Sequence, residues 1–465
     1  MAKRSRKASK PAAKAETFGV SIRMYRLGVG DCFLLRFQRG EDGEPPYSIL
    51  IDCGIHQSAK GGSDLIRRVV QDIADVTSKK LDLLVGTHEH WDHISGFSQA
   101  EDIFSTMVAK KAWLAWTEND ADELAQKIAL KEKRYQALAL LSAADNRLRL
   151  SGAGPDPKLE SLMGFFGPGG GVKLKKAGDN FKSLAGDEIE FLKPGGHPIE
   201  LPGIAARVYV LGPPRNEKLI AKNAPSRSTS EVYEFGHFAA AADRLEKATH
   251  QGNAPFDSRF AIPMKASSGI DFFSRHYWGD FTPDASDCGV EEPRQDWRRA
   301  DNAWSQLAES LALNLDEDTN NTSLVLAFEL GDTPGEGPIL LFAADAQVGN
   351  WLGWKDLTFQ AGAKTVTSRD LLARTIVYKV AHHASHNATL REEGLELMDA
   401  LELALVPTDD AMAAKVKWGT LPWPALLERL DEKASAGVVR TDRSSAPSRG
   451  RFRVTKSDLF FEFYL

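Results

Sequence analysis

Four potential metal ligands follow one short apolar segment of this chain. Residues 81–86 (Leu-Asp-Leu-Leu-Val-Gly) have the composition of a buried strand and run directly into the motif His88-x-His90-x-Asp92-His93. His88 and His90 are two residues apart at the strand end, so both side chains can point to the same side. Asp92 and His93 lie on the following turn and can reach a second, neighbouring point. The spacing therefore predicts a metal centre, since imidazole and carboxylate are usual ligands of zinc and also suit manganese and iron.

Two further strand ends carry groups of the same chemistry. Asp345 directly follows the apolar strand expected at residues 339–343, and a carboxylate at that edge could bridge two metals. The strand expected at residues 375–381 ends in His382 and His383. One of this pair should complete the second metal, and its neighbour should contact substrate or donate a proton. We assign the metal to His382 and the proton to His383, although the pattern leaves the reverse assignment open.

The order of the expected elements indicates an α/β protein. Strands are expected at residues 20–26, 32–37, 47–52, 81–86, 186–193, 206–212, 323–330, 339–343, 375–381 and 458–465. Helices are expected at residues 63–77, 119–147, 303–313, 369–374 and 424–433. Residues 150–182 are rich in glycine and indicate a loop or flap, and residues 213–303 indicate a long polar insertion with some hidden helix. Ligand sites in α/β sheets lie at the carboxyl ends of strands, which is where all three motifs stand.

Charge and composition limit the classes of partner. The chain has 58 basic and 64 acidic residues and a net charge of −6. Residues 1–16 hold six basic groups and one acid, a charge of +5, so the remainder carries −11. We therefore expect a disordered basic tail at residues 1–16 and an acidic body, which does not suit a dedicated duplex-DNA binder. Three cysteines, no apolar run of about 18 residues and no apolar segment behind the basic start lead us to expect a cytoplasmic protein without a membrane partner.

These motifs, in this order, resemble the metallo-β-lactamase superfamily, and most closely the soluble domain of bacterial competence (DNA-uptake) proteins and their stand-alone relatives. Four shorter motifs add to the resemblance: Gly28-Val-Gly-Asp31, Ile51-Asp-Cys-Gly54, Asn321-Thr-Ser-Leu-Val-Leu326 and the turn His382-His-Ala-Ser385. The resemblance covers about residues 18–116, 206–212, 320–406 and the C-terminal end. It implies a single αββα sandwich at residues 17–465, with insertions at about 117–182 and 213–303.

The chain departs from the family pattern in two respects. Ala344 and Ala384 stand where that branch usually has glycine. In addition, the superfamily usually has a further histidine between the first motif and the bridging aspartate, and here Asn320 or Asn321 occupies its expected place. The candidates for a replacement are His197, His237, His250 and His276. We therefore expect weaker binding of the first metal, or a site with one metal.

The resemblance implies a hydrolase with one or two zinc ions, or with manganese or iron. A bound metal lowers the pKa of water to near 7, and Asp92 would orient the resulting hydroxide. Ser385, His386 and Asn321 are the expected substrate contacts. We expect phosphoester substrates, either small molecules or nucleic-acid-like. The alternatives are lactone, thioester or β-lactam substrates, since the same metal core serves all of these, and a non-catalytic metal-binding interaction module.

Overall fold

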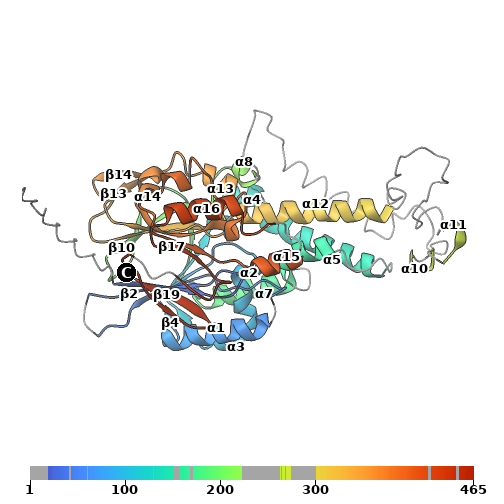
Figure 1. Cartoon of the computed structure of the whole chain (residues 1–465), viewed down its shortest axis with the longest axis horizontal. Coiled ribbons are helices and arrows are strands. Elements are labelled where there is room, and N and C mark those ends of the chain that lie inside the picture. The colour runs from blue at the N-terminus through green and yellow to red at the C-terminus, as the bar shows by residue number, and fades with distance from the viewer. Residues whose placement is uncertain are drawn as a thin grey trace, which may run out of the picture.

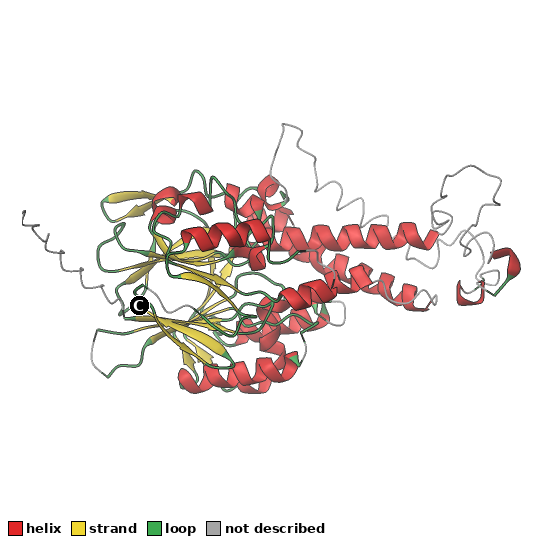
Figure 2. Ribbon diagram, in the orientation of Figure 1, coloured by secondary structure: helices red, strands yellow, loops and turns green. Residues whose placement is uncertain are grey.

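The computed structural model describes residues 19–40, 43–59, 61–128, 130–150, 157–167, 171–222, 262, 264–267, 269–273, 300–416, 420–446 and 450–465. The predicted basic tail and three of the candidate histidines, His237, His250 and His276, lie outside these ranges. The described residues form strands and helices in alternation, so the predicted mixed α/β class is confirmed (Figure 2). None of the described helices combines the length and the apolar run that crossing a membrane requires.

The first sheet has eight strands and is antiparallel on one side and parallel on the other. Its order is β18 (Arg453–Lys456), β19 (Phe460–Tyr464), β1 (Val20–Tyr25), β2 (Phe33–Phe37), β3 (Tyr47–Ile51), β5 (Leu83–Val85), β7 (Ala112–Ala115) and β8 (Ile189–Leu192). The pairs from β18 to β3 are antiparallel, and those from β3 to β8 are parallel. The C-terminal strand β19 thus pairs with the first strand β1, and β18 forms that edge of the sheet.

The second sheet has seven strands. Its order is β17 (Gly437–Arg440), β16 (Leu403–Val406), β15 (Thr375–Lys379), β12 (Ile339–Phe342), β11 (Val325–Leu330), β10 (Ala206–Gly212) and β9 (Ile199–Glu200). The pairs from β17 to β12 are parallel, and those from β12 to β9 are antiparallel. Parallel pairing aligns the carboxyl ends of β12 and β15 at one edge of the sheet, which is where Asp345 and the histidine pair follow.

The two sheets pack face to face and share one apolar core. Phe33 of the first sheet meets Phe342 of the second edge to face, with ring centroids 5.4 Å apart. Helices α1 (Gly62–Val76), α2 (Trp91–Gln99) and α7 (Val172–Ser183) cover the outer face of the first sheet. Helices α13 (Val348–Leu352), α14 (Ser368–Ala373) and α16 (Pro424–Lys433) cover the second. The result is four layers, helix, sheet, sheet and helix, as Figure 2 shows.

The first inserted segment is largely helical where it is described. The helix expected at residues 119–147 is confirmed as α4 (Glu123–Ile128) and α5 (Leu130–Leu150). The prediction of a loop at residues 150–182 is wrong for the described residues. These form α6 (Pro157–Met163), a 3-10 turn (Gly164–Phe166) and α7. The reason is the spacing of Leu174, Ala177 and Phe181, which puts three apolar side chains on one buried face of α7.

A pair of long helices extends from the layered body. Helix α12 (Ala300–Asn321) packs along α5 and α6, and α12 and α5 point away from the sheets together (Figure 1). The predicted helix at 303–313 is thus present but eight residues longer at its C-terminal end. The smaller described elements are β4 (Lys80–Leu81), α3 (Glu101–Phe104), β6 (Val108–Ala109), α8 (Glu217–Ile220), α10 (Met264–Ser267), α11 (Asp271–Phe273), β13 (Thr358–Ala361), β14 (Lys364–Thr367) and α15 (Asp410–Val416).

Candidate metal centre

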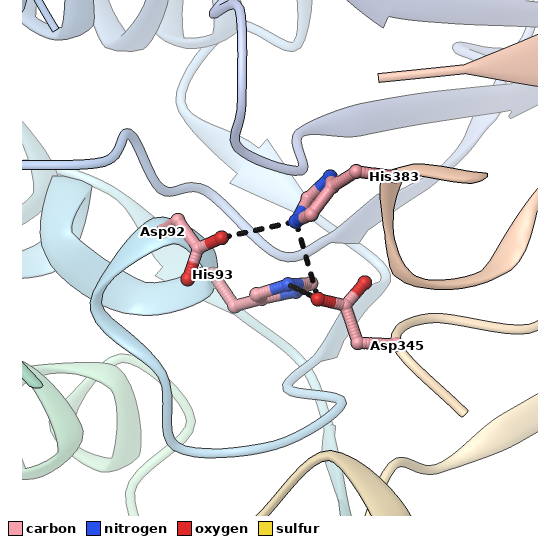
Figure 3. A group of neighbouring side chains, drawn as sticks. All are labelled: Asp92, His93, Asp345 and His383. Carbon is pink, nitrogen blue, oxygen red and sulfur yellow. Dashed lines mark hydrogen bonds and ion pairs between the residues drawn. The ribbon is translucent and has the colours of Figure 1, made fainter. Parts of the chain in front are cut away.

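Four buried side chains from three strand ends converge on one point. Asp92 and His93 lie in the first turn of α2, Asp345 follows β12, and His383 follows β15 (Figure 3). The Nε2 atom of His383 lies 3.1 Å from Oδ2 of Asp92 and 3.2 Å from Oδ2 of Asp345. The Nε2 atom of His93 lies 3.1 Å from the same Asp345 oxygen. All four ligand atoms fall within 4.8 Å of one another, so this group could hold a metal ion.

The turn that carries Asp92 and His93 is held by backbone hydrogen bonds from two distant loops. The amide of Asp31 donates to the carbonyl of Asp92 at 3.0 Å, and the amide of Cys53 donates to that of His93 at 2.8 Å. Gly54 packs so tightly here that a Cβ atom on it would lie 2.2 Å from the carbonyl carbon of Asp92. The Gly-x-Gly-Asp and Asp-Cys-Gly motifs therefore clamp the ligand turn, and glycine at position 54 is required by this close approach.

The loops after β12 and β15 both use left-handed backbone conformations. Ala344 has φ of 47°, and His382, His383 and Ala384 have φ of 40°, 54° and 63°. A residue other than glycine in this conformation costs about 1–2 kcal/mol, because its Cβ approaches the following carbonyl. Ala344 and Ala384 are therefore strained positions.

The imidazoles of the cluster are anchored by their outer nitrogens. His93 donates from Nδ1 to Oδ2 of Asp52 at 2.8 Å, and Asp52 also accepts from the Thr87 hydroxyl at 2.6 Å and the Thr87 amide at 2.8 Å. His383 donates from Nδ1 to the carbonyl of Pro407 at 2.9 Å. Both rings consequently present Nε2 toward the carboxylates. An outer anchor of this kind is typical of histidines that bind metals, since it fixes the tautomer and the ring orientation.

A buried lysine stands behind Asp345. Lys379, at the end of β15, donates from Nζ to the carbonyl of Ala344 at 2.7 Å and to Oδ1 of Asp345 at 3.2 Å. It also forms an ion pair with Asp31. The lysine thereby orients Asp345 with Oδ2 toward His93 and His383. Its ammonium group compensates part of the negative charge of the two aspartates.

The carboxylates set the protonation of this cluster. Burial alone would lower the pKa of His383, but Asp345 and Asp92 raise it to about 10. The pKa of His93 is likewise raised well above its usual value against the effect of burial, by Asp345, Asp31 and Asp52. A metal ion would replace protons that these carboxylates otherwise hold on the two imidazoles. The site is thus built to attract positive charge.

His88 and His90 lie beside this cluster and face each other. The Nε2 atom of His88 is 3.1 Å from Nδ1 of His90, and the His88 ring centroid is 4.1 Å from that of His93. Burial and the neighbouring histidines keep the pKa of His88 well below its usual value. The pKa of His90 is lowered to about 3, chiefly by burial. Both imidazoles are therefore neutral, the form that binds a metal.

The structure places His383, and not His382, in the metal-binding group. His383 occupies the place in the cluster that was assigned to His382. His382 lies half-buried outside the cluster, with Nδ1 2.8 Å from Oγ of Ser385 and 3.0 Å from Nε2 of Gln347. Its Nε2 is 3.3 Å from Nδ2 of Asn320. The reason is the left-handed backbone at both residues, which turns the two side chains apart in a way that strand periodicity does not predict.

The predicted substrate contacts are spread around the cluster. Ser385 lies beside His382 and donates to the side chain of Asn387 at 2.8 Å. His386 is exposed, and its ring lies 6.0 Å from that of Trp423. Asn321 is buried, donates to the carbonyl of Lys222 and accepts from the amide of Asn350, both at 3.0 Å. These bonds brace the start of β11, and the substrate role of all three residues stays a prediction.

The histidine candidates for the first metal position are not near it where they are described. His197 is exposed and lies 3.1 Å from the carbonyl of Gln360, and the other three lie outside the described residues. Asp52, Thr87 and Lys379 also belong to the site, and the sequence motifs did not predict them. Lys379 could have been predicted, because it is a charged residue in an otherwise apolar strand directly before the histidine pair.

The chain has no match among the protein-family models that were scanned, and no curated protein sequence matches it.

Proposed function

We propose that this protein is a metal-dependent hydrolase of the metallo-β-lactamase fold that acts on phosphoester substrates. One observation carries the proposal: Asp92, His93, Asp345 and His383 come from three strand ends in two different sheets and converge on a single buried point. Buried charged groups of this number are costly unless they are paired or coordinate a metal.

The arrangement of the layers supports an αββα sandwich of the metallo-β-lactamase type. Two sheets share a core and carry helices on their outer faces. The ligands follow β5, β12 and β15 in the order that the sequence motifs have in that superfamily. On this proposal residues 17–465 are one domain, and the segments at about 117–182 and 213–303 are insertions into it.

The donor atoms fit a zinc ion, with manganese or iron as alternatives. The imidazole nitrogens Nε2 of His93 and His383 and the oxygens of Asp92 and Asp345 would hold it. Oδ1 of Asp92 is buried and lacks a hydrogen-bond partner within the described part of the chain, as expected of an atom meant for a metal or for water. The bound metal would supply the Lewis acidity that makes water a nucleophile at neutral pH.

The protein's own groups would position the reactants. Asp92 has one oxygen toward His383 and its second oxygen unpartnered among the described residues, so it can accept a hydrogen bond from the attacking water and orient it. Lys379 holds Asp345 in place. We give His383 the metal-binding role. Burial lowers the pKa of His382 to about 4, so its imidazole is neutral near pH 7 and we assign it no role as an acid.

The choice of phosphoesters rests on the motifs shared with the competence-type branch, and the substrate class is separable by experiment. Lactones, thioesters and β-lactams need the same nucleophile, and the acidic body of the chain does not favour long nucleic acids. A substrate panel of bis(p-nitrophenyl) phosphate, single-stranded DNA, RNA, cyclic nucleotides and a lactone distinguishes these classes.

The test compares metal content and turnover in the full chain, in Asp92→Asn and in the matched control Asp399→Asn. Asp399 is an exposed aspartate outside the metal-binding group. We expect wild type and Asp399→Asn to bind zinc and cleave the phosphodiester, and Asp92→Asn to lose roughly 100-fold or more in kcat. Turnover of the lactone alone would support the carbonyl alternative. Metal binding without turnover of any ester would support a non-catalytic module, and absence of metal would overturn the proposal.

A further inference from the structure

The C-terminal part of α12 lies beside His90, the second histidine of the His88-x-His90 motif. Asp316, on the penultimate turn of α12, is buried, and its Oδ1 atom lies 3.7 Å from Nε2 of His90. Neither atom has a hydrogen-bond partner within the described residues. Two unpartnered polar atoms that face each other in a buried setting need an explanation.

The tautomer of His88 follows from its surroundings. The Thr87 hydroxyl donates its proton to Asp52 at 2.6 Å, so it can only accept at the 3.1 Å contact with Nδ1 of His88. We infer that His88 carries its proton on Nδ1, where the more distant Oγ of Ser323, at 3.4 Å, can also act as an acceptor. Its lone pair on Nε2 points toward Nδ1 of His90, 3.1 Å away. A cation placed between these two nitrogens needs the proton of His90 to sit on Nε2, which is the atom that faces Asp316.

We propose that Asp316 is a positioning residue that accepts a hydrogen bond from the Nε2–H group of His90. This bond would hold Nδ1 of His90 toward His88 and so complete the first metal position of this chain. A shift of about 0.8 Å closes the 3.7 Å gap to the ~2.9 Å of an N–H···O bond. Asp52 plays the same part for His93, since it accepts a hydrogen bond from the ring nitrogen of His93 that faces away from the metal-binding group. The inference rests on the metal centre proposed above and extends it to a second position.

Asp316 is itself held in the orientation that this role needs. Asn320, one turn later on α12, donates from Nδ2 to Oδ2 of Asp316 at 3.4 Å and leaves Oδ1 toward His90. The same Nδ2 atom lies 3.3 Å from Nε2 of His382. Polar contacts thus run from His90 through Asp316 and Asn320 to His382.

The two long helices brace the His-Glu-His segment from both sides. Helix α12 reaches His90 through Asp316, and α5 reaches the intervening Glu89 through two residues. The Tyr135 hydroxyl donates to Oε2 of Glu89 at 3.1 Å, and Nη1 of Arg134 lies 3.5 Å from the same oxygen. The first inserted segment therefore contacts the motif that carries His88 and His90 and is not only surface decoration.

The experiment measures zinc stoichiometry and affinity by competition with a chromophoric chelator in wild type, Asp316→Asn and Asp316→Ala. We expect two zinc ions in wild type, one of them weaker. Asp316→Ala should weaken only that ion, by roughly 10- to 100-fold, as loss of an outer partner does. Asp316→Asn keeps an oxygen acceptor and should fall between the two proteins, which provides a rescue that a purely structural role would not give.

A spectroscopic measurement on unmutated protein keeps the test independent of folding defects. In zinc-loaded protein labelled with 15N-histidine, His90 should show metal on Nδ1 and a proton on Nε2, with its signals assigned from a His90→Gln variant. Metal on Nε2 of His90, a single zinc in wild type, or an unchanged weaker site in Asp316→Ala would each overturn the inference while leaving the main centre intact. A wild type that binds no zinc would instead overturn the proposed function.

Discussion

Lys379 places its ammonium nitrogen 3.2 Å from Oδ1 of Asp345, so a fully buried cation stands behind the carboxylate that faces both His93 and His383. The lysine also pairs with Asp31. Its positive charge offsets the negative charge of Asp31 and Asp345 when no metal is bound. Its position fixes which oxygen of Asp345 points inward.

Replacing this lysine should therefore destabilise the metal-free protein more than the metal-loaded protein. We expect Lys379→Met to lower the free energy of unfolding by about 3–5 kcal/mol in chelator, because it leaves two buried carboxylates uncompensated. Zinc should recover part of that loss, since a bound cation supplies positive charge to the same carboxylate. Urea denaturation with chelator and with zinc measures both values. An equal loss in the two conditions would contradict the role given to Lys379.

Metal binding at the main centre should release protons. Without metal, Asp345 and Asp92 raise the pKa of His383 to about 10 and so keep it protonated at neutral pH. A metal must displace that proton, so the apparent affinity should rise with pH throughout the range below about 10. Calorimetry in two buffers of different ionisation enthalpy counts the protons released. An affinity independent of pH between 6 and 8 would show that the imidazoles are already neutral.

Glu118 gives a pH dependence that is separate from the metal. Burial raises the pKa of Glu118, Glu89 raises it as well and Arg134 opposes the shift, so that the pKa is about 7 and not the usual 4.5. The folded protein then binds more protons than the unfolded chain between those values, so this group's contribution to stability falls as pH rises from about 4.5 to about 7. Glu118→Gln should remove that part of the slope, worth on the order of 1–3 kcal/mol. The comparison is the difference between variant and wild type in urea denaturation at each pH, and a constant difference would contradict it.

Replacing either strained alanine with glycine should stabilise the folded protein. Ala344 and Ala384 have φ of 47° and 63°, where a Cβ is unfavourable. We expect Ala344→Gly and Ala384→Gly each to raise the free energy of unfolding by about 0.5–1 kcal/mol. The matched control is Ala346→Gly, at a buried alanine of the same loop without positive φ, which should lose about as much. Thermal unfolding that ranks all three variants alike would refute the strain argument.

Strand ends were the part of the site that the sequence could locate. His90, Asp92, His93 and Asp345 all follow apolar runs, and the α/β topology brings such ends to a common edge. The choice between His382 and His383 could not be made, because it depends on left-handed backbone angles in a turn.

Contacts between distant segments were beyond sequence reasoning. Asp316 lies beyond the helix expected at residues 303–313, in the run Asp-Glu-Asp-Thr-Asn-Asn, which has low helix propensity. Tertiary packing overrides that propensity, since Leu315 and Thr319 are buried beside it. The loop predicted at residues 150–182 was wrong over α7, because the glycine content of that range outweighed the helical spacing of Leu174, Ala177 and Phe181.

The central claim is that His383, and not its neighbour, completes a metal centre with Asp92, His93 and Asp345. Equilibrium zinc titration of wild type, His383→Gln and His382→Gln tests it most directly. We expect His383→Gln to lose the tightly bound zinc ion and His382→Gln to keep it with unchanged affinity. Loss of that ion in His382→Gln with retention in His383→Gln would contradict the account.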